Sequence, residues 1–202
     1  MPQYCEDLFS DTTSRINDGN CNFVFAGNIG KMQSVETILK AAELLKEDKK
    51  IFFHIVGDGR DLENCKHFAE ERNLTNVIFY GRKPVNDMPK FYSIADAMIV
   101  TLSKDELVSK TLPGKMQSYM AAGKPIIACA DGEIKTIINE AKCGLCCEAE
   151  DYKEFSNLFT YFANHLEIAI DMGQNSKLFF EKYFKKEMFF EKLTEIFNEV
   201  TE

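Results

Sequence analysis

The stretch PGKMQSYMAAGKPIIA, residues 113–128, predicts a loop, a short helix, a tight turn and a buried strand in direct succession. Pro113 suits the first helical position, where a missing N–H loses no hydrogen bond, and Gly123 suits the left-handed residue after the helix. Met116 and Met120 are four residues apart and therefore share one helix face. A helix that begins at a basic glycine loop offers free N–H groups and a positive dipole end to an anion. The sequence therefore directs the search for function to the N-terminus of this helix.

Short apolar runs alternate with helical patterns on both sides of this stretch. Continuous apolar strands between helices predict a parallel sheet that is covered on both faces. We therefore expect an α/β fold with a doubly wound, mostly parallel, Rossmann-like sheet of about six strands and extra C-terminal helices. This domain is expected to span residues 22–202, after a linker segment at residues 1–21. The expected strands are 23–26, 51–56, 77–80, 97–100, 126–129 and 144–147.

Composition limits the classes of partner. The chain has 202 residues and a net charge of −8, which disfavours broad attraction to nucleic acid or anionic lipid. No apolar run approaches the ~20 residues of a transmembrane helix. Seven cysteines, an odd number without a framework spacing, indicate reduced thiols. We therefore expect a cytoplasmic protein that binds no nucleic acid and has no transmembrane segment.

Three glycine turns follow the first three expected strands. Gly27-Asn28-Ile29-Gly30-Lys31 is either a phosphate-binding turn or an ordinary strand-to-helix connection. It matches neither GxGxxG nor a Walker A loop, which disfavours classical dinucleotide binding and P-loop hydrolysis. Gly57-Asp58-Gly59 and Gly81-Arg82-Lys83 are structural turns that could also lie beside a ligand. An arginine such as Arg82 could stack on a base or bind phosphate, although an exposed arginine without a role is the alternative.

Other candidate sites are weaker. Cys143, Cys146 and Cys147 lie on an expected apolar strand, and the three histidines are scattered, so a zinc site is disfavoured. A nucleophilic cysteine is disfavoured too, because it has no obvious histidine partner. No carboxylate cluster indicates a bound cation, so we expect no cofactor and a metal-independent function. The aromatic region 179–190 favours helix packing over a nucleobase platform.

Taken together, segments 26–31, 55–59, 77–82, 113–128 and 131–133 resemble the C-terminal, donor-binding half of retaining glycosyltransferases of the GT-B fold, in family 4. The resemblance covers roughly residues 20–200 and is closest to bacterial enzymes that build surface polysaccharides. It implies a nucleoside-diphosphate sugar donor, with UDP the commonest nucleotide, and a metal-independent transfer to a glycan or lipid-linked acceptor. The acceptor would bind an N-terminal half that nothing here resembles. Such a half could also attach the protein to the inner membrane.

The resemblance and the chemistry of the residues assign two sites and no catalytic residue. Asn28 stands where the family commonly has arginine, and Gln33 lies near the usual lysine. The two family glutamates fall on Lys110 and Ser118, so neither carboxylate is present. The expected diphosphate site is Gly27, Asn28, Gly30, Lys31, Thr111, Leu112, Pro113, Gly114 and Lys115, and the expected nucleoside site is Gly57, Asp58, Arg82, Lys83 and Ser118.

We expect Lys31 and Lys115 to bind one diphosphate from exposed positions, where a lysine contributes little to stability. Two other functions stay open at this point. The first is a non-catalytic module that binds a nucleotide or phosphosugar. The second is a response-regulator-like interaction domain, which needs an acidic pocket after the first strand; Asn28 and Lys31 argue against one.

Overall fold

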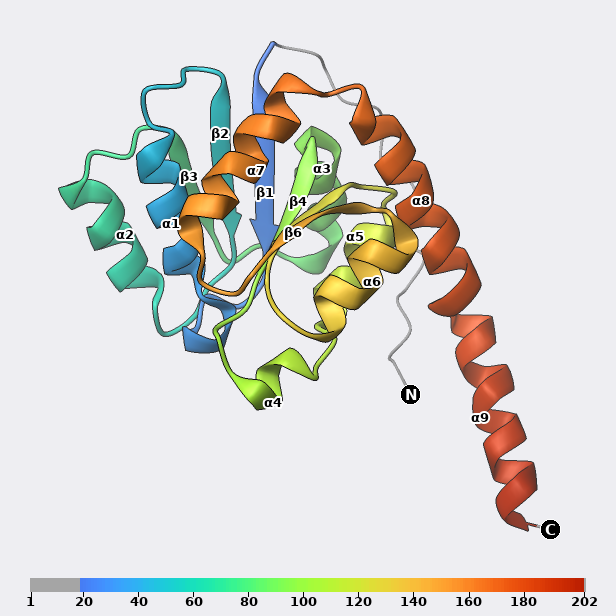
Figure 1. The fold of residues 1–202 in the computed structure, drawn as a ribbon. Coiled ribbons are helices and arrows are strands. Elements are labelled where there is room, and N and C mark those ends of the chain that lie inside the picture. The colour runs from blue at the N-terminus through green and yellow to red at the C-terminus, as the bar shows by residue number, and fades with distance from the viewer. Residues whose placement is uncertain (1–18, 202) are drawn as a thin grey trace.

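The computed structural model describes residues 19–201 and contains one six-stranded sheet (Figure 1). Every neighbouring pair of strands is parallel, and the order across the sheet is β3-β2-β1-β4-β5-β6. The expected doubly wound α/β fold is thus confirmed, while most of the expected linker lies outside the described residues. The strands are β1 (Cys21–Ala26), β2 (Ile51–Val56), β3 (Val77–Gly81), β4 (Ala97–Thr101), β5 (Ile126–Cys129) and β6 (Gly144–Cys147).

Helices cover both faces of the sheet. Figure 1 shows α1, α2 and α7 on one face and α3, α5 and α6 on the other, with α8 passing beside α5 and α9 extending away from the sheet. The α-helices are α1 (Val35–Leu44), α2 (Leu62–Glu71), α3 (Met88–Ile94), α4 (Glu106–Ser109), α5 (Gly114–Ala121), α6 (Glu133–Ala141), α7 (Tyr152–Asn164), α8 (Ile168–Tyr183) and α9 (Lys186–Thr201). Two 3₁₀ turns are η2 (Lys31–Gln33) and η3 (Val85–Asp87).

The core has two layers because side chains alternate along each strand. Phe23 and Phe25 of β1 point into the layer beneath α1 and α7, where the Phe23 ring lies 4.5 Å from that of Phe159. Val24 and Ala26 point into the opposite layer, beneath α3, α5 and α6. Each layer is a continuous cluster of buried apolar residues, so the sheet is covered on both faces, as its apolar strands require.

The strand order reverses between β1 and β4. The chain builds β1, β2 and β3 outward in one direction, and then returns to place β4 on the other side of β1. The connections that leave the carboxyl ends of β1 and β4 therefore diverge, and in open α/β sheets this divergence forms the ligand crevice. The glycine turns and the start of α5 all lie at this edge, so the fold brings the sequence candidates to one place.

One local expectation was wrong, and one helix was not expected. Pro113 has an extended backbone (φ −65°, ψ 136°) and precedes α5, whose first residue is Gly114. The sequence also gave no expectation of α4, a single helical turn that the side chain of Asp105 caps by accepting hydrogen bonds from the backbone of residues 107 and 108. Gly123 has the expected left-handed conformation, with φ +63°.

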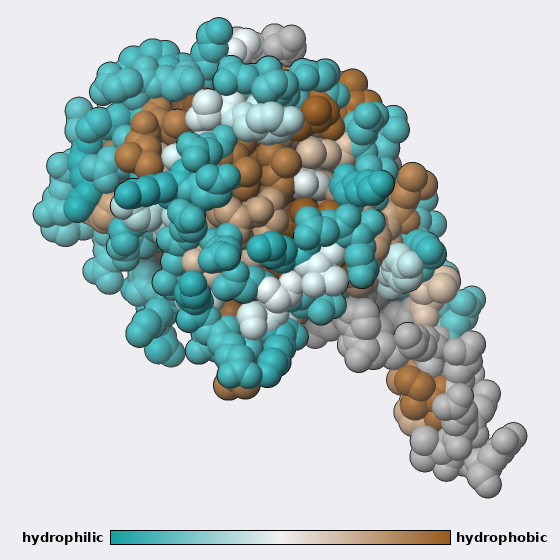
Figure 2. Space-filling view, in the orientation of Figure 1, coloured by the Kyte–Doolittle hydropathy of each residue, from teal (hydrophilic) through white to brown (hydrophobic). Residues whose placement is uncertain are grey.

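Hydrophilic residues cover most of the face shown in Figure 2, and apolar side chains are exposed on the projecting α9. Within residues 19–201, no helix has the length and apolar character needed to cross a bilayer.

Candidate functional site

The loops after β1 and β2 are hydrogen-bonded to each other along the carboxyl edge of the sheet. The Gly27 N–H donates to the Val56 carbonyl at 2.9 Å, and the Ile29 N–H donates to the Asp58 carbonyl at 2.8 Å. The Gly57 N–H in turn donates to the Gly81 carbonyl at 3.0 Å. Three glycine turns that are distant in sequence therefore form one continuous surface.

Close backbone packing explains why glycine stands in these turns. Gly57 has φ +146°, and a Cβ atom placed on it would lie 1.8 Å from the Gly27 carbonyl oxygen. Gly59 has φ +158°, and a Cβ atom there would lie 2.2 Å from the Ile29 carbonyl oxygen. Any side chain at either position would separate the two loops.

A cavity of about 430 Å³ opens between these loops. This volume lies in the range of small-molecule sites. It combines the exposed cations Arg82 and Lys83 with the Asp58 carboxylate and closely packed backbone, which suits a polar ligand that carries negative charge. Its lining residues are Gly27, Asn28, Val56, Gly57, Asp58, Gly59, Arg82, Lys83 and Met88, so all of the expected nucleoside-site residues except Ser118 lie together.

Tyr119 attaches α5 to the end of β1. Its buried hydroxyl donates to the Ala26 carbonyl and accepts from the Ala26 N–H, both at 2.9 Å. Burial raises the pKa of Tyr119 well above its ordinary value, so the phenol stays protonated and can donate. This anchor places the N-terminus of α5, which no side chain caps, beside the Gly27 turn.

Lys115 extends from the first turn of α5 to a position beneath the Gly27 turn. Its ammonium lies 4.0 Å from the ring centroid of Phe25 and 3.0 Å from the place that a Gly27 Cβ would occupy. The ammonium donates a hydrogen bond to Oε1 of Gln33. Burial lowers the pKa of Lys115 to about 7. The expectation that Lys115 is exposed was therefore wrong.

This burial predicts a stabilising substitution, Lys115→Met. The folded-state pKa of Lys115 lies below its unfolded value of 10.5, so the unfolded chain binds more protons between about pH 7 and pH 10.5. The free energy of unfolding of the wild type should therefore rise with pH across that window. Methionine removes the desolvated charge and should add about 1–2 kcal/mol at pH 6.5.

Urea unfolding of both proteins at pH 6.5 and pH 9 measures this effect. The advantage of the Met variant should shrink at pH 9, where the wild-type amine is neutral. A Met variant that is less stable than the wild type at pH 6.5 would contradict this account of Lys115.

Gln33 is the residue that sequence reasoning missed. It ends the turn η2, and its backbone carbonyl accepts a hydrogen bond from the Thr101 hydroxyl at the end of β4. The Ser103 N–H donates to the Met32 carbonyl at 2.9 Å and holds the same turn. The backbone of Gln33 is therefore anchored against the end of β4, beside the point where the strand order reverses. Its place near the usual lysine of the resembled family was the only signal in the sequence.

The turn η2 also places Lys31 away from Lys115. Lys31 and Gly30 line a second cavity, of about 410 Å³, together with Glu36, Asp61 and Glu150. Lys31 is exposed there among carboxylates, whereas Lys115 lies beneath Gly27 on the other side of the turn. The two lysines that were expected to bind one diphosphate thus lie on different sides of the turn, and Lys115 lines neither of these two cavities.

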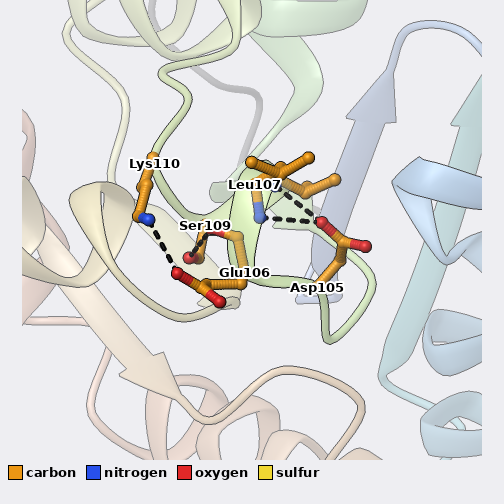
Figure 3. A network of polar contacts seen from close by, with 6 residues as sticks. Asp105, Glu106, Leu107, Ser109 and Lys110 are labelled. Atoms are coloured by element: carbon orange, nitrogen blue, oxygen red, sulfur yellow. Dashed lines mark hydrogen bonds and ion pairs between the residues drawn. The ribbon is translucent and has the colours of Figure 1, made fainter.

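The two positions of the missing glutamates lie before α5, at Lys110, and within α5, at Ser118. Figure 3 shows the polar network of α4, in which the Lys110 ammonium lies 2.8 Å from the Glu106 carboxylate. Thr111 donates to the Val108 carbonyl at 2.7 Å, and the Ser118 hydroxyl donates to the Gly114 carbonyl at 3.2 Å. Ser118 keeps its oxygen lone pairs as acceptors for a ligand hydroxyl.

The cysteine cluster is part of the core. Cys143 and Cys147 are buried, and burial raises the pKa of Cys143 and of Cys146 to about 11. Thiols with raised pKa values are poor nucleophiles and poor metal ligands. No group of side chains suited to hold a metal ion occurs in the described part of the chain.

Comparison with known proteins gives relatives that are named as glycosyltransferases. The family model described as glycosyl transferases group 1 matches residues 9–179. The probable glycosyltransferase WbjE of Pseudomonas aeruginosa is 34% identical over 131 residues, which are 64% of this chain and 32% of that protein. The uncharacterized glycosyltransferase MJ1178 of Methanocaldococcus jannaschii is 24% identical over 168 residues, 83% of this chain and 45% of that protein. The chain thus spans about a third to a half of these relatives.

Solved structures share the fold. Sucrose-phosphate synthase from Thermosynechococcus elongatus superposes with a TM-score of 0.81 at 16% identity, over 99% of this chain and 52% of that one. HepE from Anabaena, solved in complex with UDP, has a TM-score of 0.78 at 14% identity, over 89% of this chain and 49% of that one. The resemblance to a glycosyltransferase domain of the GT-B fold is confirmed. The family match extends over most of the chain, which therefore belongs to the glycosyl transferases group 1 family.

Proposed function

We propose that this chain is the donor-binding part of a retaining glycosyltransferase. The enzyme takes a sugar from a nucleoside diphosphate, UDP by preference, and transfers it to a glycan or lipid-linked acceptor in the synthesis of bacterial surface polysaccharide. The transfer reaction takes place in the cytoplasm and needs no metal ion. The acceptor binds a further domain of the full-length protein.

One observation carries this proposal: the Lys115 ammonium and the uncapped start of α5 face the Gly27 turn beside a cavity of about 430 Å³. A helix N-terminus, a partly buried cation and close backbone together suit a diphosphate. Arg82 and Lys83 border the same cavity from the β3 side, where a nucleoside would extend. HepE, which shares this fold, was solved in complex with UDP, and this supports UDP as the nucleotide.

The proposed chemistry is stabilisation of a leaving group. As the bond between the anomeric carbon and the phosphate oxygen breaks, negative charge grows on the diphosphate. A fixed cation and helix N–H groups bind that charge more tightly than they bind the intact donor, which lowers the barrier. Lys115 and the N–H groups at Gly114 and Lys115 supply this stabilisation, and Gly27 lets them approach because it has no side chain.

Calorimetric titration with a panel of nucleoside diphosphates, with and without magnesium, tests the proposal. UDP should bind with one site per chain and with the same affinity in both conditions. A requirement for magnesium would contradict the metal-independent part. No binding by any nucleoside diphosphate at millimolar concentration would contradict the donor site itself.

Residues 1–202 alone should transfer no sugar, because nothing in this chain is assigned to bind the acceptor. Incubation with radiolabelled UDP-sugars and lipid-linked acceptors, followed by chromatography, measures transfer. Turnover by this chain alone would show that the acceptor site lies within it.

A non-catalytic nucleotide-binding module is the second candidate function. The replacement of both expected carboxylates by Lys110 and Ser118 favours it. An activity assay on the full-length protein distinguishes the two candidate functions. A non-catalytic module would bind UDP but would neither hydrolyse a UDP-sugar nor transfer its sugar.

A further inference from the structure

The cation beneath the Gly27 turn has an uncharged partner. Lys115 donates to the amide oxygen of Gln33 and lies over the Phe25 ring. An amide oxygen directs an ammonium without neutralising it, and an aromatic face attracts the cation only weakly. The charge of Lys115 therefore remains available to a ligand.

The surrounding carboxylates are occupied elsewhere. Asp58 accepts a hydrogen bond from the Gly59 N–H, Asp105 caps α4, and Glu106 is paired with Lys110. Asp131 accepts from the Ala149 N–H at 3.2 Å. Among the described residues, no carboxylate forms an ion pair with Lys115, and its surroundings penalise the charged form through burial alone. Other charged groups on the neighbouring turns and helices include Lys31, Glu36, Arg60, Asp61, Arg82, Lys83, Lys104, Glu133 and Glu150.

The backbone of Gln33 is held by hydrogen bonds. Hydrogen bonds from Thr101 to its carbonyl and from Ser103 to the neighbouring Met32 carbonyl fix the turn η2 against the end of β4. The backbone from which the Gln33 side chain extends is therefore anchored, and its amide oxygen accepts the hydrogen bond from Lys115.

We propose that Gln33 is a positioning residue, which holds the Lys115 amine beneath the Gly27 turn without a counter-charge, so that a diphosphate and a proton bind to the site together. The inference rests on the proposed donor site. A glutamate at position 33 would keep Lys115 charged at all times and would repel the phosphates. The amide instead leaves the amine partly neutral near pH 7, and the arriving phosphates shift it to the ammonium.

Titration calorimetry with UDP at pH 8, in buffers of different ionisation enthalpy, counts the protons that binding takes up. UDP contributes none, because its terminal phosphate, with a pKa of about 6, is fully ionised at pH 8. Free Lys115 is then about one-tenth protonated, and a phosphate contact that raises its pKa by about 1–2 units should take up roughly 0.4–0.8 proton per UDP.

Three variants and one control test the assignment of this proton to Lys115. Lys115→Arg, which stays charged, should reduce the uptake to nearly zero. Gln33→Glu should also reduce the uptake to nearly zero and weaken UDP binding about tenfold, because its carboxylate holds the proton in the free protein. Gln33→Met removes the acceptor at similar size and should weaken binding about two- to tenfold. Lys49→Arg, at the opposite edge of the sheet where β2 begins, should keep the wild-type count.

The outcomes distinguish this inference from the function on which it rests. Binding of UDP with no proton uptake by the wild type would overturn the inference and leave the donor site standing. An unchanged proton count in Gln33→Glu would overturn it as well, since a merely structural glutamine would give that result. Failure of the wild type to bind UDP at all would overturn the donor site and the inference together.

Discussion

Lys115→Ala is expected to weaken UDP binding by about one to two orders of magnitude at pH 6.5. At this pH most of the Lys115 side chains carry a proton, because burial lowers the pKa of this group only to about 7. A charge-assisted contact with phosphate contributes roughly 1.5–3 kcal/mol, which corresponds to that loss of affinity. The loss should be smaller at pH 9, where the wild-type amine enters the site largely neutral. Titration calorimetry with UDP at both pH values measures the dissociation constants.

Lys49→Ala is the matched control for this substitution. Lys49 is exposed in the turn before β2, at the amino edge of the sheet, and its loss should leave UDP affinity unchanged. Urea unfolding verifies that both variants are folded. If a folded Lys115→Ala protein bound UDP as tightly as the wild type at pH 6.5, Lys115 would have no contact with the diphosphate.

Gly57→Ala is expected to damage both stability and binding. The new Cβ atom would lie 1.8 Å from the Gly27 carbonyl oxygen, and φ +146° is itself unfavourable for alanine. The loops after β1 and β2 must separate, which breaks the hydrogen bonds that link them. We expect the free energy of unfolding to fall by about 2–4 kcal/mol. The affinity for UDP should also fall, by more than about tenfold.

Gly81→Ala distinguishes the cost of backbone strain from the cost of a steric clash with the new Cβ atom. Gly81 also has a left-handed backbone, φ +67°, but a Cβ atom there would meet nothing within 4 Å. Its cost should be limited to about 1 kcal/mol of backbone strain. Chemical denaturation of the two variants gives both values. Equal costs would mean that the close approach of Gly57 to Gly27 does not hold the site together.

The sheet could be predicted from sequence because each strand is a continuous apolar run between a helix and a glycine turn. This pattern has few structural solutions, and the order of the strands places their turns at one edge. The helix α4 was beyond prediction because four residues carry no helical period, and a single cap at Asp105 decides its formation.

The geometry of the lysines depends on distant contacts. Lys115 looked like an exposed charge because nothing local shows that Tyr119 attaches α5 to Ala26. That anchor places the side chain of Lys115 beneath Gly27, which lies 88 positions earlier in the chain (115 − 27 = 88). Lys31 was predicted to bind phosphate because it follows Gly30, and the 3₁₀ turn places it at the neighbouring cavity, which the sequence did not indicate. Sequence spacing predicts which turns meet, but tertiary anchors decide where long side chains end.

The central claim is that a nucleoside diphosphate binds at the carboxyl edge between β1, β2 and α5. Amide chemical shifts of the ¹⁵N-labelled protein, recorded during titration with UDP, test it residue by residue. The account predicts large, saturable shifts for Gly27, Asn28, Gly57 and Lys115 and none for Lys49 at the opposite edge. Unchanged shifts at those four residues with millimolar UDP, or shifts centred elsewhere on the sheet, would contradict it.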